Sequence, residues 1–305
     1  MEKVAVLMST YNGEKYIKEQ IDSILAQKDT EVSLYIRDDG SKDSTLDIIR
    51  EICSENENVH LLVGKNNLGV GNSFMNLIYI VPDTFDYYAL SDQDDIWCEE
   101  KLIEAIKLLK ETDCSLYASN QENVDKYGKS NGLRYTDEKI HLTTESIIFS
   151  NMLAGCTMVF PVEFKKLLSE EGRRPSQALL KTRIHDVWVA GVATVVKGIV
   201  YDNRSFMKYR QHENNVVGAK KDTIIDDLIL KWKKVKNPNL RNGRSAFSTA
   251  LVECFGDYIP ADSKVRVFSE ASNNKLKLIF DTNELCSYNG EKPVLFILKV
   301  LLGLF

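Results

Sequence analysis

Short apolar runs and amphipathic stretches alternate along the first third of the chain. Residues 4–8 are all apolar, and the side chains that follow have the spacing of one helix face: Tyr16, Ile17, Ile21, Ile24 and Leu25. The same pair of patterns recurs three times, with strand-like runs at 34–36, 59–63 and 87–90 and helical patterns at 44–53, 72–81 and 99–109. This alternation predicts an α/β fold with a mostly parallel sheet covered by helices on both faces.

The pattern changes in the second half of the chain. Residues 120–144 are polar and irregular, and a strand is predicted at 156–160 and a helix at 163–171. Beyond residue 220 the pattern is helical, with one apolar face formed by Ile224, Ile225, Leu228, Trp232 and Val235. We therefore expect a first domain at residues 1–219 and a helical C-terminal extension at residues 220–305.

Charge separates these two parts. The whole chain carries a formal charge of −5, but residues 220–305 contain 14 Lys or Arg against 10 Asp or Glu. Six of the bases lie within 231–244 with no acid among them, which favours contact with an anionic surface. Only this stretch is basic enough for nucleic acid, and six bases with one Trp are more typical of a solvated or lipid-facing surface, so no nucleic-acid partner is expected. The six cysteines show no CxxC or Cys/His spacing, so neither a disulfide scaffold nor a zinc site is expected.

The two ends of the chain bear on its location. The apolar run at 4–8 is too short for a signal sequence, so a cytoplasmic protein is expected. Residues 292–305 are largely apolar, yet a membrane-spanning helix needs about twenty residues. This tail either packs on the protein, forms a dimer interface, or lies peripherally on the inner face of the cell membrane with the help of the nearby bases.

Three acidic clusters stand at positions where chemistry is expected. Residues 38–41 (DDGS) end the second predicted strand, 92–95 (DQDD) end the fourth, and His185-Asp186 opens an apolar helix predicted at 185–196. Carboxylates at the ends of parallel strands converge on one sheet edge, where they repel unless a cation lies among them. Oxygen ligands select Mg²⁺ or Mn²⁺, and such a cation suits a nucleoside diphosphate. For any single cluster, turn formation and helix capping are the alternative.

With these motifs the sequence resembles glycosyltransferase family 2, the inverting transferases with the A-type nucleotide-sugar fold. The resemblance covers about residues 1–218 and rests on four segments: VAVLMSTYNG at 4–13, IRDDGSKDS at 36–44, NLG at 67–69 and SDQDDIW at 91–97. It implies a Rossmann-like, mostly parallel central sheet with helices on both faces. It also implies a nucleotide-sugar binding half at about 1–118 and an acceptor half at 119–219.

The resemblance further implies roles for individual residues. The residues expected on the nucleotide-sugar donor are Ser9, Tyr11, Asp39, Asn67 and Asp92, of which the first three would contact the base and ribose. Asp94 would bind the metal, and Asp186 matches the family's catalytic base. An inverting transfer needs one such carboxylate to accept the proton of the acceptor hydroxyl. A carboxylate at a helix N-terminus also stabilises the helix, so capping is the alternative for Asp186.

Three segments are similar to bacterial rhamnosyltransferases that build capsular and cell-wall polysaccharides from dTDP-L-rhamnose. They are SDQDDIW at 91–97, HDVW at 185–188 and YRQHENNVVG at 209–218. This resemblance places His212 in a loop where a neutral imidazole reaches the metal or the diphosphate, with a surface histidine as the alternative. Related sequences transfer other sugars, so a UDP-hexose donor stays open.

Three further residues are candidates for the acceptor side: Trp97, His185 and Trp188. Sugar faces stack on indole rings, but core packing explains the two tryptophans equally well. The acceptor itself is expected to be a glycan or a polyprenyl-linked glycan.

Two other functions fit the pattern less well. A nucleotidyltransferase would need a glycine-rich basic loop early in the chain, and residues 9–15 (STYNGEK) lack one. A non-catalytic sugar-binding module would not require DxD behind a strand or His185-Asp186. The sequence therefore predicts a metal-dependent, inverting glycosyltransferase.

Overall fold

The protein forms two compact units in the computed structural model, which describes residues 1–64, 66–136, 139–212 and 242–305. The first, here called the sheet unit, contains residues 1–139, 153–170 and 197–219. The second, the helical unit, contains residues 140–152, 171–196 and 220–305. Two segments within the predicted first domain thus group with the C-terminal helices. The predicted functional boundary at 219/220 stays a prediction, because compactness does not test it.

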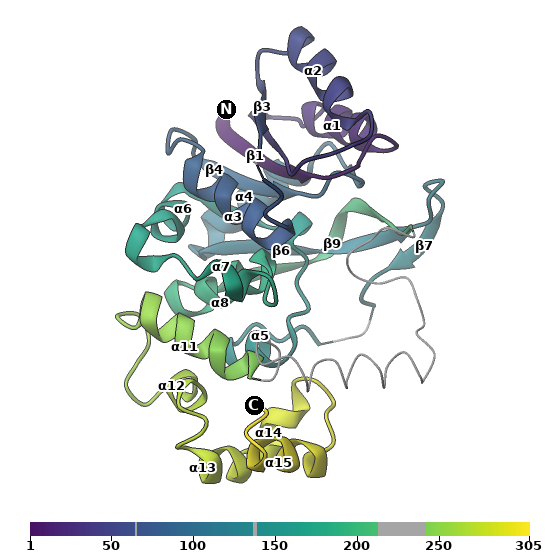
Figure 1. The fold of residues 1–305 in the computed structure, drawn as a ribbon. Helices are drawn as coiled ribbons and strands as arrows, with labels where there is room; N and C mark the ends of the chain where they lie inside the picture. Colours follow the sequence, from purple (N-terminus) through teal and green to yellow (C-terminus); the bar gives the residue numbers. More distant parts are fainter. Residues whose placement is uncertain (65, 137–138, 213–241) are drawn as a thin grey trace. The chain divides into compact units, whose positions relative to one another are not determined.

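A nine-stranded sheet organises the sheet unit (Figure 1). Eight strands follow the order β3-β2-β1-β4-β8-β6-β9-β5, and β7 pairs with β6. Their bounds are β1 Glu2–Thr10, β2 Thr30–Asp38, β3 Val59–Val63, β4 Tyr87–Ser91, β5 Ile96–Trp97, β6 Leu116–Val124, β7 Ser130–Leu133, β8 Val159–Pro161 and β9 Ile199–Arg210. The neighbours of β1, and the pairs β2–β3 and β6–β9, are parallel, which confirms the predicted mostly parallel sheet.

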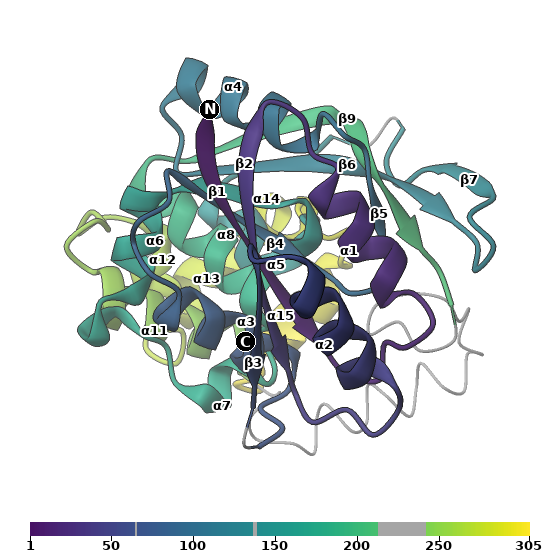
Figure 2. The ribbon, with the colours of Figure 1, turned by 90° about the horizontal axis from the view of Figure 1, so that it is seen from above.

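Strand β1 lies at the centre of this core. Residues 4–8 are fully buried, which explains why this strand is continuously apolar rather than alternating. Val4, Val6 and Met8 share one apolar cluster with helices α1 (Ile17–Leu25), α2 (Thr45–Glu55) and α4 (Lys101–Thr112). Figure 2 shows α1 and α2 side by side in this layer. The opposite side of β1 meets α3 (Val70–Ile80), which in turn contacts α6 (Val162–Ser169), so helices cover both faces as predicted.

The polar stretch at 120–144 is more regular than predicted. Strand β6 continues to Val124, and a turn leads back into β7. In that turn Asp125 Oδ1 accepts hydrogen bonds from the backbone N–H groups of Tyr127 and Lys129, and Gly128 adopts a φ of +84°. Asp and Gly at these positions favour a turn, but this local signal does not stand out within a stretch that is polar throughout.

The helical unit is built from α5 Thr144–Ser150, α7 Gln177–Leu180, α8 His185–Val196, α11 Gly243–Phe255, α12 Lys264–Ser269, α13 Lys275–Phe280, α14 Thr282–Ser287 and α15 Pro293–Leu301. Helix α8 crosses α11 closely, because a Cβ on Gly191 would lie 2.6 Å from Phe247 Cζ. The described part of the extension is helical, as expected, whereas the predicted apolar face at 224–235 lies outside the described residues.

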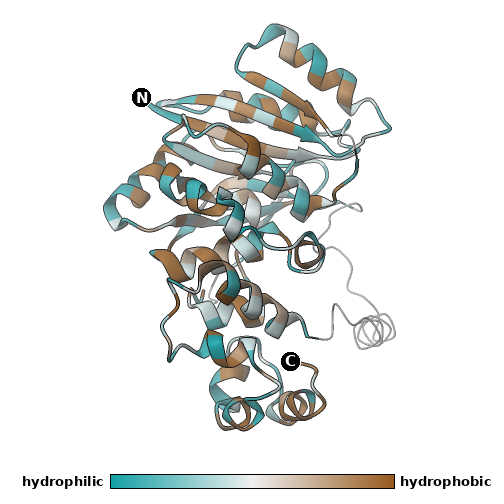
Figure 3. Ribbon diagram, turned by 60° about the vertical axis from the view of Figure 1, so that its left-hand side comes forward, coloured by the Kyte–Doolittle hydropathy of each residue, from teal (hydrophilic) through white to brown (hydrophobic). Residues whose placement is uncertain are grey.

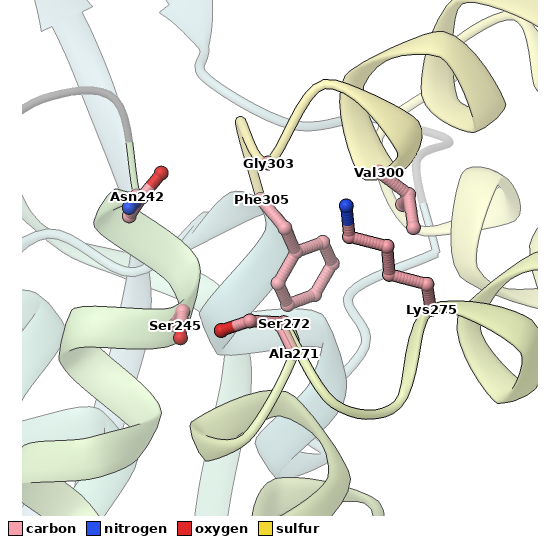
Figure 4. A pocket seen from close by; sticks show the side chains of 8 residues that line it. All are labelled: Asn242, Ser245, Ala271, Ser272, Lys275, Val300, Gly303 and Phe305. Atoms are coloured by element: carbon pink, nitrogen blue, oxygen red, sulfur yellow. The ribbon is translucent and has the colours of Figure 1, made fainter.

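Aromatic side chains hold the C-terminal helices together. Phe149 of α5 packs against three phenylalanines with ring centroids 5.8 to 5.9 Å apart: Phe268, Phe296 and Phe305. The Arg244 guanidinium lies 4.2 Å from the centre of the Phe149 ring and pairs with Glu291. Figure 4 shows Phe305 beside Val300 and Lys275, where they line a small cavity of this unit. Among the described residues, no helix combines the length and the apolar character needed to cross a membrane.

Candidate active site

Strand register brings three predicted loops to one edge of the sheet. Thr10 pairs with Asp38, and Met8 pairs with Ser91, so β1, β2 and β4 end at nearly the same level. The loops that follow these strands therefore lie together, as the carboxyl ends of parallel strands require. Gln93 joins two of them, because its Oε1 accepts hydrogen bonds from Thr10 Oγ1 at 2.5 Å and from the Tyr11 backbone N–H at 2.8 Å.

Asp38 shapes its own loop. Its Oδ2 accepts hydrogen bonds from the backbone N–H groups of Gly40 and Ser41, both at 2.9 Å. Gly40 has a φ of +96°, a conformation that glycine adopts without strain. The turn-forming alternative therefore describes Asp38, which is fully buried.

Asp39 connects its loop to the segment that contains Asn67. Its two carboxylate oxygens accept the backbone N–H groups of Leu68 and Gly69, each at 2.8 Å. Asp39 also forms a buried ion pair with Arg37. Asn67 Oδ1 accepts the same Gly69 N–H at 3.1 Å, so Asp39 and Asn67 lie in one hydrogen-bonded loop pair.

A chain of polar groups extends from Asp39 to β1. The Arg37 guanidinium also donates to Ser73 Oγ at 3.1 Å, and Ser9 Oγ donates to the same hydroxyl at 2.6 Å. Tyr11, by contrast, keeps 46% of its surface exposed at the strand end. Four of the predicted donor residues thus lie at or near the ends of strands in the sheet unit: Ser9 among the last residues of β1, and Tyr11, Asp39 and Asn67 in the loops that follow strands. Their roles toward a nucleotide stay predictions.

The acidic loop after β4 meets the end of β9. Asp94 Oδ2 lies 2.8 Å from His212 Nε2, and both side chains are close to nine-tenths buried. The imidazole stacks on Tyr16 with ring centroids 5.1 Å apart. The Arg210 Nε donates to the Asp94 backbone carbonyl at 3.0 Å, and the Arg210 backbone N–H donates to Asp95 Oδ1 at 3.2 Å. The structure therefore brings the two predicted metal ligands, Asp94 and His212, into contact.

A second group of ionisable side chains lies beneath this loop. One oxygen each of Asp92 and Asp95 and the Cys156 sulfur all lie within 4.8 Å of one another. Burial raises the pKa of the Asp95 carboxyl well above its usual range, and the charges of Asp94 and Asp92 raise it further. The ammonium of Lys101, also fully buried, lies 4.4 Å from the centre of the Trp97 ring, and burial lowers its pKa to about 8.

The acidic loop could hold a divalent cation. It offers carboxylate oxygens and one imidazole nitrogen, and the combination of these donors suits Mn²⁺ at least as well as Mg²⁺. The repulsion of Asp95 by the charges of Asp94 and Asp92 would be relieved by such an ion.

The candidate acceptor residues are in the core. Trp97 is 4% exposed and belongs to the apolar cluster of the sheet unit. Trp188 is fully buried, with its ring 5.8 Å from that of Phe247. This burial fits the core-packing alternative for both indoles, and their role toward an acceptor stays a prediction. His185 is also buried, which lowers its pKa to about 3.

Asp186 lies in the first turn of α8, in the helical unit. It is partly exposed, and its Oδ1 accepts the Val187 backbone N–H at 2.7 Å. This position fits both the predicted base and the capping alternative, so the catalytic assignment stays a prediction.

Sequence reasoning missed the residues that support this site: Gln93, Arg210, Lys101 and Tyr16. One signal was available for Lys101, which occupies the apolar face of a predicted helix in phase with Leu102, Ala105 and Leu109. A lysine at such a position is buried and therefore needs partners. Gln93 and Arg210 gave no comparable signal, because their contacts join segments more than 80 residues apart.

Comparisons with known proteins agree with this geometry. The family model described as glycosyl transferase family 2 matches residues 5–165. The chain is 36% identical over 220 residues to the dTDP-rhamnosyl transferase RfbG of Shigella flexneri, covering 70% of this chain and 74% of that protein. It is 26% identical to the uncharacterized glycosyltransferase RT0329 of Rickettsia typhi, over 69% of this chain and 64% of that one.

Solved structures show the same fold. The TarS fragment 1–349 of S. aureus, in complex with UDP, gives a TM-score of 0.57 at 17% identity and covers 94% of this chain and 89% of its own. The mannosyltransferase PcManGT of Pyrobaculum calidifontis, in complex with GDP-Man and Mn²⁺, gives 0.51 at 15% identity, over 99% and 80%. These likenesses establish the A-type fold. With the family model matching more than half of its length, the chain belongs to glycosyltransferase family 2 and is a glycosyltransferase.

Proposed function

We propose that the protein is an inverting, metal-dependent rhamnosyltransferase that uses dTDP-L-rhamnose in cell-surface polysaccharide synthesis. The observation that carries the donor is the 36% identity to a dTDP-rhamnosyl transferase across most of both chains. The contact between Asp94 and His212 supports the metal dependence, because it gathers a carboxylate and an imidazole at the edge where the donor's diphosphate would bind.

The donor would be held by the loops after β1, β2 and β4. Tyr11 is exposed enough to stack on the thymine base, and Asp39 is fixed by Arg37 and by the loop that contains Asn67. Ser9 shares the hydrogen-bond network of Arg37 through Ser73. Asp92, at the end of β4, would contact the sugar-diphosphate part.

Asp94 and His212 would hold Mn²⁺ or Mg²⁺. When bound, such a cation neutralises the charge of the departing nucleoside diphosphate. Neighbouring side chains would keep the two ligands in position. The Tyr16 ring stacks on His212, and Arg210 donates a hydrogen bond to the backbone carbonyl of Asp94.

Asp186 would act as the general base. Its carboxylate would accept the proton of the acceptor hydroxyl while that oxygen bonds to the anomeric carbon and the bond to the diphosphate breaks on the opposite face. The sugar's configuration is then inverted. The start of α8 favours the ionised carboxylate that a base requires.

A panel of donors tests this proposal. Hydrolysis is measured with dTDP-L-rhamnose, UDP-glucose, UDP-galactose and UDP-N-acetylglucosamine, each with Mn²⁺ and with a chelator. We expect dTDP-L-rhamnose to be consumed fastest, and only with the metal. Preference for a UDP-hexose would replace the donor assignment. Full activity in the presence of the chelator would refute the proposed metal dependence.

We further propose that the acceptor is a glycan carried on a polyprenyl lipid, with the protein peripheral on the inner face of the cell membrane. The predicted basic stretch at 231–244 was one reason for this expectation, but most of it lies outside the described residues. Arg244 is described, and its contacts with Phe149 and Glu291 take it away from any surface role. A membrane contact must therefore rest on other residues.

A further inference from the structure

Helices α13 and α15 carry an outward apolar surface. On α15 and the residue after it, Val294, Leu295, Leu298, Leu301 and Leu302 have the spacing of one helix face, and each is 49% to 69% exposed. On α13, Leu276 and Phe280 lie one turn apart and are 73% and 86% exposed. We call these seven side chains the α13–α15 face. Figure 3 shows the chain leading to the C-terminus coloured mainly as hydrophobic.

Buried side chains and one hydrogen bond hold the two helices in place. The opposite side of α15 buries Phe296 and Val300, and Phe296 packs on Phe149 and Phe305. Lys275 donates a hydrogen bond from Nζ to the Leu301 carbonyl at 3.0 Å, which ties α13 to the end of α15. The apolar tail residues thus divide between core and surface, and the buried ones hold the exposed ones in place.

Positive charge surrounds this face. Lys277 and Lys292 are exposed, and neither forms an ion pair with a described residue. The three acids between 272 and 305 have partners of their own, since Glu291 pairs with Arg244 and Lys299, and Asp281 and Glu284 pair with Lys264. The uncompensated charge beside the face is therefore basic.

We propose that the α13–α15 face docks on an anionic lipid bilayer, with its apolar side chains in the headgroup region and Lys277 and Lys292 on the lipid phosphates. Leu276 and Phe280 are the most exposed side chains of the face, so they have the largest fraction of apolar surface to bury in lipid. A second copy of this chain fits less well, because a two-fold interface would set the same lysines against each other without free acids to pair with them. The proposal deepens the assignment of a lipid-linked acceptor and rests on it for its purpose.

Vesicle sedimentation of the full chain, without any sugar donor, tests the face. Vesicles of phosphatidylcholine and phosphatidylglycerol in equal parts are compared with pure phosphatidylcholine, at low and high salt. We expect binding to the anionic vesicles that weakens as salt screens the charges. The double variant Phe280→Ser/Leu298→Ser should lower the partition coefficient by about tenfold or more. Lys277→Glu/Lys292→Glu should abolish the preference for anionic lipid.

Leu133→Ser is the matched control, because it removes an exposed leucine from β7 in the sheet unit and should leave binding unchanged. Donor hydrolysis by each variant shows whether the fold is intact. It also distinguishes a loss of membrane binding by the α13–α15 face from a failure of the proposed chemistry. Absent or variant-insensitive vesicle binding overturns the proposal. A dimer in light scattering that the Phe280→Ser/Leu298→Ser variant converts to a monomer would instead assign the face to a second copy.

Discussion

His212 Nε2 lies 2.8 Å from Asp94 Oδ2, and this contact joins the end of β9 to the acidic loop after β4. If both groups hold the cation, Asp94→Ala should abolish metal-dependent dTDP binding. His212→Ala should weaken it by roughly tenfold to a hundredfold, the usual range for groups that support a metal site. Calorimetry of dTDP with and without Mn²⁺ measures both, with His60→Ala on β3 as the control. Unchanged affinity in Asp94→Ala would refute the metal assignment.

Asp186→Asn separates binding from chemistry. The amide keeps the size of the side chain but cannot accept the proton, so transfer should fall by about 10² to 10⁴ while dTDP affinity stays the same. Initial rates of rhamnose transfer and calorimetry of dTDP give the two numbers. Asp262→Asn, an exposed acid of the helical unit, is the control. Near-normal turnover would mean that another residue is the base.

Asp39→Ala should affect both donor recognition and stability. The donor KM should rise far more than kcat falls, because Asp39 is expected to contact the nucleotide. The substitution also leaves the buried Arg37 without its carboxylate, which costs roughly 3–5 kcal/mol of unfolding free energy. Steady-state kinetics and urea unfolding measure the two effects. A KM that does not change would leave Asp39 with its structural role alone.

His185 predicts a specific dependence of stability on pH. Burial lowers the pKa of its imidazole to about 3, against an ordinary value of about 6.5 in the unfolded chain. Between these values the unfolded chain binds the extra proton, so this contribution is complete above pH 6.5 and is lost as pH falls toward 3. The slope should be about 1.4 kcal/mol per pH unit between about pH 4 and 6. Urea unfolding of the wild type and of His185→Gln should show it only in the wild type, and parallel curves would contradict it.

The sheet was predictable because its strands are defined by burial on both faces. Residues 4–8 are apolar without a break, and a helix with one apolar side precedes each of β2, β3 and β4. Strand order then brings Asp39 and Asp94 to one edge without further information. What could not be predicted depends on packing between distant segments. An apolar tail looks uniform in sequence, and its packing against the distant Phe149 ring makes Phe296 core while Leu298 stays at the surface.

Arg210 has a consequence for how fast and how selectively a donor can bind. Its side chain bonds the Asp94 carbonyl, Glu19 and the Lys126 carbonyl, so the acidic loop is ordered by folding itself. Ordering a loop at the moment of binding consumes interaction energy and slows association. A loop ordered in advance leaves that energy available for distinguishing one nucleotide-sugar from another. Discrimination at this site should therefore be expressed mainly in how long the donor stays, with little variation in how quickly it arrives.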